Sequence, residues 1–234
     1  MSRVFGKTKQ YIQSICVELG RRIPSKWAHG LYVLTNYILL GQWIKSEQLA
    51  LPKRLANRYE VYNIVLNEIK EKKILYLEFG VAAGESMRYW SKTLTHPESI
   101  LHGFDSFEGL PEDFDMFGST VKGRFDQQGQ FPKIDDGRIR FFKGWFDDTL
   151  PTYVVPPHDI LVINMDADLY SSTKTIFHYI GAQVKVGTYI YFDDMGRVDH
   201  EPKALHEFIE TTKLKFEVIA ADHTCNKMFF RVVG

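Results

Sequence analysis

The sequence predicts a doubly wound α/β fold, in which helices cover both faces of a mostly parallel sheet. The chain has 234 residues, enough for one large domain that buries a full sheet. From Ile74 onward short apolar runs alternate with helical patterns, the order that builds parallel strands through right-handed crossovers. Near the C-terminus two apolar runs are joined by a link too short for a helix, which indicates one reversed strand.

The chain before this alternation is predicted to be a helical extension, residues 1–54, followed by the main domain, residues 55–234. Residues 1–26 are basic, with six Lys/Arg against the single acid Glu18. A solvated helical arm is the favoured interpretation, because no aromatic-rich apolar face accompanies these charges in the sequence. A weak contact with a membrane surface or an anionic ligand is the alternative. The basic residues are Arg3, Lys7, Lys9, Arg21, Arg22 and Lys26.

The longest apolar stretch, residues 31–43, is interrupted by polar residues and falls short of the roughly 20 residues that span a bilayer. It therefore predicts a buried or partner-facing helix and no transmembrane segment. The aromatic residues around Trp27 and Trp43 make a homodimer a hypothesis. Residues 55–69 carry apolar side chains at three- and four-residue intervals, which predicts an amphipathic helix leading into the core.

The predicted architecture is the Rossmann-like class I methyltransferase fold: a seven-stranded, mostly parallel sheet with an antiparallel last strand and helices on both faces. A dinucleotide dehydrogenase would usually continue with parallel strands. The expected helices are residues 86–94, 171–180 and 202–212. The expected strands are residues 74–79, 100–105, 138–143, 159–166, 188–193, 215–221 and 227–233.

Residues 106–137 form a long connection without a clear period. A connection of this length in a compact domain is more often a functional lid than an idle loop, so we expect a lid insertion here. A disordered surface insertion is the alternative.

The composition of the sequence and the motifs it lacks argue against several functional classes. Lys+Arg and Asp+Glu both total 29, so the chain lacks the basic excess that gathers nucleic acid. Two distant cysteines, Cys16 and Cys225, without a secretory signal favour reduced thiols in a cytoplasmic protein. Zinc-ligand spacing and the G-x-S-x-G elbow of α/β-hydrolases are both missing from the sequence.

The first candidate site lies where the first core strand turns into a helix. Gly80 and Gly84 have the spacing E-x-G-x-x-x-G after Glu78, which lets the backbone approach a ligand at a helix N-terminus. A merely tight turn explains the same pattern equally well. Asp105 ends the next strand, where a carboxylate can accept hydrogen bonds from ribose hydroxyls. Together the two features suggest a nucleoside cofactor, although Asp105 could instead cap a turn with Ser106.

The second candidate site is carboxylic. Asp166 ends one apolar strand and the pair Asp193 and Asp194 ends another, and both strand ends face one crevice in an open α/β sheet. Three clustered carboxylates repel one another unless a cation or protonation compensates, and such ligands suit magnesium or calcium. A hard cation would lower the pKa of an acceptor hydroxyl while Asp166 takes its proton. Asp168 is interpreted as a cap of the following helix.

Five sequence blocks resemble the macrocin O-methyltransferase family, across residues 58–194. They are L-E-F-G at 77–80, G-F-D-S-F-E-G-L-P-E at 103–112, G-W-F-D-D-T-L-P at 144–151, D-A-D-L-Y-S-S-T at 166–173 and the pair at 193–194. Enzymes of this family use S-adenosylmethionine (AdoMet) and a metal ion, and they methylate sugar hydroxyls of antibiotics and related natural products.

The resemblance implies roles for individual residues. Glu78, Gly80 and Ser86 would border the methionyl and ribose parts of AdoMet. The turn Gly144-Trp145-Phe146 would lie near the adenine. Asp105 and Ser106 would hold the ribose, while Asp166, Asp193 and Asp194 would bind Mg²⁺ and Asp166 would also act as the base.

The acceptor is expected to be a small molecule with a hydroxyl group, a sugar or a glycoside. Residues 195–197, Met-Gly-Arg, depart from the family's usual continuation, so the resemblance does not identify the acceptor. Two other readings stay open: a metal-independent N- or C-methyltransferase, and a non-catalytic AdoMet-binding module.

Overall fold

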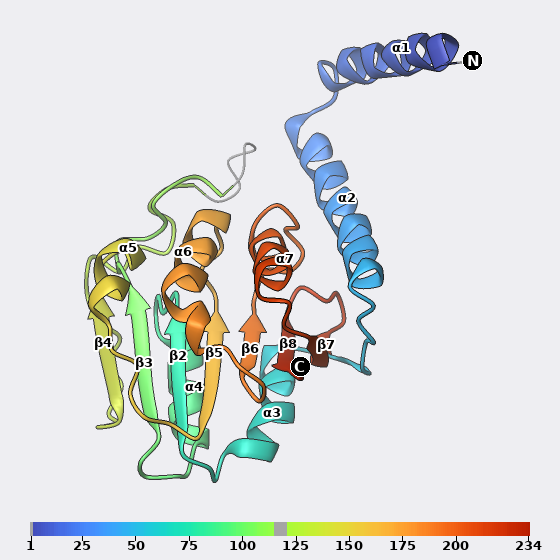
Figure 1. Ribbon diagram of the computed structural model, residues 1–234. Coiled ribbons are helices and arrows are strands. Elements are labelled where there is room, and N and C mark those ends of the chain that lie inside the picture. Colours follow the sequence, from blue (N-terminus) through green and yellow to red (C-terminus); the bar gives the residue numbers. More distant parts are fainter. Residues whose placement is uncertain (1, 115–120) are drawn as a thin grey trace.

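A computed structural model describes residues 2–114 and 121–234, with side chains from Thr8 onward (Figure 1). The described chain folds around a sheet with the strand order β1-β7-β8-β6-β5-β2-β3-β4. The predicted strands are confirmed, with ends that differ by a residue or two. They are β2 (Ile74–Phe79), β3 (Ile100–Asp105), β4 (Ile139–Lys143), β5 (Ile160–Met165), β6 (Tyr189–Phe192), β7 (Phe216–Asp222) and β8 (Met228–Val232).

The sheet has one strand more than the seven predicted. The two-residue strand β1 (Arg54–Leu55) pairs in parallel with β7 at the sheet edge. The helix expected from residue 55 accordingly begins later, as α3 (Arg58–Ile69). Asn57 fixes this start, because its side chain accepts hydrogen bonds from the backbone N–H groups of Tyr59 and Glu60.

The strand order reverses between β2 and β5, which are parallel neighbours. The chain runs from β2 outward through β3 and β4 on one side, and from β5 to β6 on the other. This reversal leaves a crevice at the carboxyl ends of the strands, where ligands bind in open α/β sheets. Strand β8 is antiparallel to both β6 and β7, which confirms the predicted reversed last strand.

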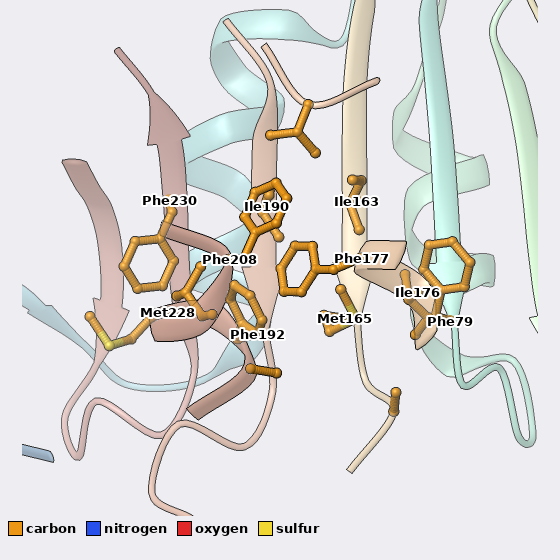
Figure 2. Packing of buried hydrophobic residues seen from close by; sticks show 14 of the residues in the cluster. Phe79, Ile163, Met165, Ile176, Phe177, Ile190, Phe192, Phe208, Met228 and Phe230 are labelled. Atoms are coloured by element: carbon orange, nitrogen blue, oxygen red, sulfur yellow. The ribbon is translucent and has the colours of Figure 1, made fainter. Parts of the chain in front are cut away.

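Helices cover both faces of the sheet (Figure 1). On one face α3 and α4 (Glu85–Thr93) enclose a core built around Tyr62, Trp90 and Phe229. On the other face the core includes side chains of α6 (Tyr170–Ile180) and α7 (Glu201–Thr212). Figure 2 shows Phe177 of α6 against Phe208 of α7, with ring centroids 4.2 Å apart. The short elements α5 (Phe146–Thr149), η1 (Leu150–Thr152) and η2 (Gly181–Gln183) complete the described secondary structure.

Two helices precede the sheet: α1 (Ser2–Gly20) and α2 (Ser25–Ser46). Helix α2 buries Asn36, Leu40 and Ile44, whereas α1 extends away from the rest of the molecule (Figure 1). Residues 31–43 are therefore buried along one side only. None of the helices in the described ranges has the length and apolar character needed to cross a membrane. The division into an extension and a main domain at residue 54 stays a prediction.

The described parts of the expected lid, residues 106–114 and 121–137, contain neither helix nor strand. Residues 115–120 of this stretch lie outside the described residues. The backbone oxygen of Phe107 accepts hydrogen bonds from the N–H groups of Gln127 and Gly129, which ties the two ends of the stretch together. Leu110 and Phe114 form a small buried cluster with Leu169, just before α6. The base of this stretch is thus packed beside the crevice, and its role as a lid stays a prediction.

Candidate functional site

A cavity of about 920 Å³ lies at the carboxyl ends of β2, β3, β5 and β6. Every site residue predicted from the sequence lines it except Gly84. The lining residues among them are Glu78, Gly80, Ser86, Asp105, Ser106, Gly144, Trp145, Phe146, Asp166, Asp193 and Asp194. Residues that the sequence left more than 100 positions apart therefore face one space, as parallel strand ends require.

The two glycines of the β2–α4 turn have different tasks. Gly80 has φ +88° and lies so close to the backbone oxygen of Asp166 that a Cβ would collide with it. Gly84 has φ +77° and is the N-cap of α4, but a Cβ there would meet the ring of Pro132 at 2.7 Å. Gly84 is thus packed against Pro132 and does not line the cavity, so its role in cofactor binding stays a prediction.

Glu78 is a buried carboxyl group at the floor of the cavity. Its Oε2 accepts a hydrogen bond from the hydroxyl of Tyr76 at 2.8 Å, and that hydroxyl in turn accepts one from the amide of Asn164 at 2.9 Å. Burial raises the pKa of Glu78 to about 8. Ser86, also buried, shares a hydrogen bond of 3.0 Å with the hydroxyl of Tyr62. Both predicted cofactor residues are therefore held rigidly by tyrosines.

Asp105 binds the loops on either side of it. Its Oδ2 accepts the backbone N–H groups of Val81 at 2.8 Å and Ala82 at 2.7 Å, and its Oδ1 accepts that of Phe107 at 2.6 Å. The turn-cap role that competed with ribose binding in the sequence is therefore present. A carboxylate oxygen has two lone pairs, so Oδ1 keeps one acceptor position beside these bonds. Capping and ribose binding are compatible here.

The turn after β4 closes another side of the cavity. The N–H of Gly144 donates to the backbone oxygen of Asp105 at 3.0 Å, which fixes the turn against β3. Phe146 packs edge-on against Phe79, with centroids 5.8 Å apart. Trp145 lies between Gly144 and Phe146 in the sequence, lines the cavity and is 37% exposed. These aromatic groups offer a flat apolar wall to a ligand.

Asp166 and Asp168 form the acidic side of the cavity with Asp194. Burial, followed by the nearby charges of Asp193 and Asp168, raises the pKa of Asp166 well above its usual value. Burial and a hydrogen bond with Asp194 raise the pKa of Asp168 to about 9. Crowded carboxyl groups of this kind are stabilised by a proton or by a cation.

The interpretation of Asp168 as a helix cap is wrong. The N-cap of α6 is Leu169, and the described contacts include no side-chain cap at that helix end. Asp168 instead has φ +59° and lines the cavity. Uncommon positive φ at a residue other than glycine is concentrated at functional positions, although the sequence carried no signal for it.

Asp193 is surrounded by donors. Its Oδ2 accepts from the guanidinium of Arg58 at 3.0 Å and the ammonium of Lys227 at 2.9 Å, and its Oδ1 accepts from the hydroxyl of Tyr191 at 2.6 Å. The positive charges of Arg58 and Lys227 therefore offset part of the repulsion between the clustered carboxylates. The sequence analysis expected a bound metal ion to offset this repulsion. Within residues 8–114 and 121–234, no three His, Cys, Asp or Glu side chains are arranged to hold a metal ion.

Four residues that support the site carried no motif in the sequence. Glu201 is buried and accepts the backbone N–H groups of Ala167 at 3.3 Å and Asp194 at 3.1 Å, so it joins the two carboxylate-bearing turns. The others, Arg58, Asn226 and Lys227, contact the aspartates after β6. Arg58 and Glu201 occupy ordinary helical positions and the other two lie beside a hairpin turn, so local patterns gave no reason to select them.

Comparison with known proteins identifies a family. The model of the macrocin-O-methyltransferase (TylF) family matches residues 52–231, more than half of the chain. Mycinamicin III 3''-O-methyltransferase of Micromonospora griseorubida is 28% identical over 130 residues, covering 54% of this chain and 47% of the relative.

A second relative and a solved structure agree. The 8-demethyl-8-(2,3-dimethoxy-alpha-L-rhamnosyl)-tetracenomycin-C 4'-O-methyltransferase of Streptomyces olivaceus is 30% identical over 123 residues, covering 44% of each chain. The match thus spans less than half the length of either curated relative. The structure of the O-methyltransferase NovP superposes with a TM-score of 0.54 at 25% identity, over 76% of this chain and 78% of that one.

Proposed function

The chain belongs to the macrocin-O-methyltransferase family, and on this premise we propose that it transfers a methyl group from AdoMet to a hydroxyl oxygen of a sugar or glycosylated natural product. One observation carries the proposal: the Gly80 turn and Asp105 open on the same cavity as the acidic group around Asp166. The proposed nucleoside site and the proposed proton acceptor would therefore be adjacent. The names of two relatives specify an oxygen position, 3'' of mycinamicin III and 4' of a rhamnosyl tetracenomycin, and they support a glycoside as the acceptor.

We assign the cofactor side of the cavity to AdoMet. Asp105, through the free position of Oδ1, and Ser106 would hold the ribose. Glu78, Gly80 and Ser86 would border the methionyl part, and residues 144–146 the adenine. The close approach of Gly80 to Asp166 supports this arrangement, because it brings the end of the cofactor turn within contact distance of the acidic group.

The acidic side of the cavity would supply the base. The acceptor oxygen gives its proton to a carboxylate and attacks the methyl carbon, while the electron pair of the carbon–sulfur bond passes to sulfur. The products are a methyl ether and S-adenosylhomocysteine (AdoHcy). We assign the proton acceptor to Asp166, as the sequence predicts; Asp168 belongs to the same acidic group and is hydrogen-bonded to Asp194.

A magnesium ion at this group would lower the pKa of the acceptor hydroxyl. The chemistry of the residues fits it in part: Asp166, Asp168 and Asp194 are hard oxygen donors whose negative charges oppose one another. Asp193 would have to give up Arg58 or Lys227 to join them. We therefore propose that Asp166 and Asp194 hold the ion. Asp193 would instead hold the turn after β6 in place through its bonds with Arg58 and Lys227.

Calorimetric titration with AdoHcy tests the cofactor before any acceptor is known. Saturable one-site binding is expected in EDTA and again with Mg²⁺. The Asp166→Asn variant should bind AdoHcy with unchanged affinity, and this binding should not depend on Mg²⁺. Asp159→Asn is the matched control, because it removes the same charge at the opposite, exposed end of strand β5. No binding in either buffer would overturn the proposal.

Transfer of labelled methyl groups to a panel of glycosides tests the reaction. Asp166→Asn should abolish transfer, while Asp159→Asn should leave it unchanged. Full activity in EDTA would remove the metal from the mechanism and favour a metal-independent enzyme. AdoHcy binding without transfer to oxygen, nitrogen or carbon acceptors would instead indicate a binding module.

A further inference from the structure

Helix α1 is an arm with no cover from its own fold. Every described side chain from Thr8 to Gly20 is exposed, and the helix extends away from the sheet beyond the far end of α2 (Figure 1). The helix has 19 residues, and most helical stability in proteins comes from packing an apolar face. A surface outside the described fold would therefore stabilise the arm.

The exposed side chains of α1 divide into two faces. At 100° per residue, Tyr11, Ile12, Ile15 and Leu19 fall within an arc of about 100°. They are between 51% and 70% exposed. The opposite face carries Gln10, Gln13 and Ser14, with Val17 as its one large apolar side chain among the described positions, while Glu18 borders the apolar arc next to Tyr11. The arm is thus an amphipathic helix whose apolar side faces water. This side is mostly aliphatic, with Tyr11 as its one aromatic residue among the described positions, so a search for an aromatic-rich face did not select it.

The charge of the arm indicates what covers this face. Residues 1–26 carry six Lys/Arg against the single acid Glu18, although the whole chain has no net charge. A second copy would bring the same positive excess, and the two arms would repel each other. An anionic surface complements the charge and accepts the apolar face at the same time.

The segment after the arm continues the same character. The chain bends at Pro24, and Trp27 in the first turn of α2 is 65% exposed. Tryptophan is enriched at membrane–water boundaries, because its ring is apolar and its N–H is polar. No described helix can span a bilayer, so the contact would be a surface one.

We propose that the amphipathic helix α1 docks the protein on an anionic lipid bilayer, with Tyr11, Ile12, Ile15 and Leu19 inserted among the head groups. The flanking basic residues, including Lys9, Arg21, Arg22 and Lys26, would contact the lipid phosphates. In Figure 1 the sheet lies toward the opposite end of α2 from α1, so docking through α1 would not require contact between the sheet and the bilayer.

Vesicle sedimentation of the full chain tests the proposal. Binding to phosphatidylcholine vesicles that contain a quarter phosphatidylglycerol should be at least about tenfold stronger than to pure phosphatidylcholine, and should weaken in high salt. Ile15→Asp should reduce the binding by about tenfold or more, because it puts a charge on the apolar face.

Val17→Asp is the matched control, since it replaces an equally exposed aliphatic residue of the same helix by the same charge on the opposite face. It should reduce binding by less than about threefold. Equal losses for the two variants, or no binding to anionic vesicles, would overturn the proposal. So would a dimeric mass in light scattering that Ile15→Asp converts to a monomer while vesicles bind neither protein, because the face would then belong to a second copy. Unchanged melting temperatures would show that both variants fold.

Discussion

The side-chain amide of Asn226 donates a hydrogen bond to the carboxylate of Asp194 at 3.0 Å, from a residue 32 positions further along the chain. The same amide nitrogen donates to the backbone oxygen of Asp193 at 2.9 Å, and Oδ1 of Asn226 accepts the N–H of Gly196 at 2.8 Å. One side chain at the β7–β8 turn thus fixes the whole turn after β6. The final hairpin of the sheet is therefore part of the candidate site.

Replacement of this amide should separate positioning from cofactor binding. Asn226→Ala removes one hydrogen-bond donor from the Asp194 carboxylate and the acceptor of the Gly196 N–H, so methyl transfer should fall by about 10- to 100-fold. AdoHcy affinity, measured by calorimetry, should change by less than about twofold, because the residues assigned to the cofactor lie on other turns. His223→Ala in the same turn is the control and should be neutral. Equal effects on transfer and AdoHcy affinity would contradict the assigned role.

Asp168 should prove essential although the sequence suggested a cap. Asp168→Asn removes a half-buried carboxyl group that would serve the acceptor or a cation, so methyl transfer should fall by about 100-fold or more. The melting temperature at pH 8 should rise, since a neutral amide avoids the cost that raises the pKa of Asp168 to about 9. Asparagine is also a good helix cap, so a variant with unchanged activity and stability would restore the cap interpretation.

Alanine substitutions at two glycines with similar φ should distinguish the cost of backbone strain from the cost of a steric collision. Gly80 has φ +88° and a Cβ there would collide with the Asp166 backbone, whereas Gly187 has φ +90° and a Cβ would meet nothing within 4 Å. Gly187→Ala should therefore cost about 1 kcal/mol of unfolding free energy. Gly80→Ala should cost about 1–3 kcal/mol more and should also weaken AdoHcy binding. Urea unfolding measures both. Equal losses of unfolding free energy for the two variants would mean that the backbone of the β2–α4 turn shifts to accommodate the added Cβ.

Glu78 should make the stability of the ligand-free protein depend on pH. Its pKa rises from 4.5 to about 8 on folding because the group is buried. Between these values the folded state holds one more proton than the unfolded state, so stability is full below about pH 4.5 and falls as the pH rises to about 8. Glu78→Gln cannot ionise and should gain stability relative to the parent chain across this window. A stability difference that stays constant with pH would refute the buried, protonated carboxyl.

Much of the fold could be predicted because it depends on local periodicity. Alternating apolar runs located β2 to β8, and the short link at residues 222–226 indicated the reversed strand that the structure confirms. The edge strand β1 escaped prediction, because two residues form no pattern and their partner lies in β7. The start of α3 shifted for a related reason: the Asn57 cap ended a periodicity that apolar spacing alone extended to residue 55.

Within the candidate site, the sequence by itself determined that the carboxylates at the strand ends reach one cavity. Glu78, Asp105 and Asp166 end parallel strands, and strand polarity alone brings such ends to one crevice. Only the tertiary structure decided what those groups contact. Arg58 pairs with Asp193 across 135 positions and Asn226 binds Asp194 across 32, and no local spacing encodes a contact made through space. The exposure of α1 was decided in the same way, because an apolar helical face is the same in sequence whether or not the fold covers it.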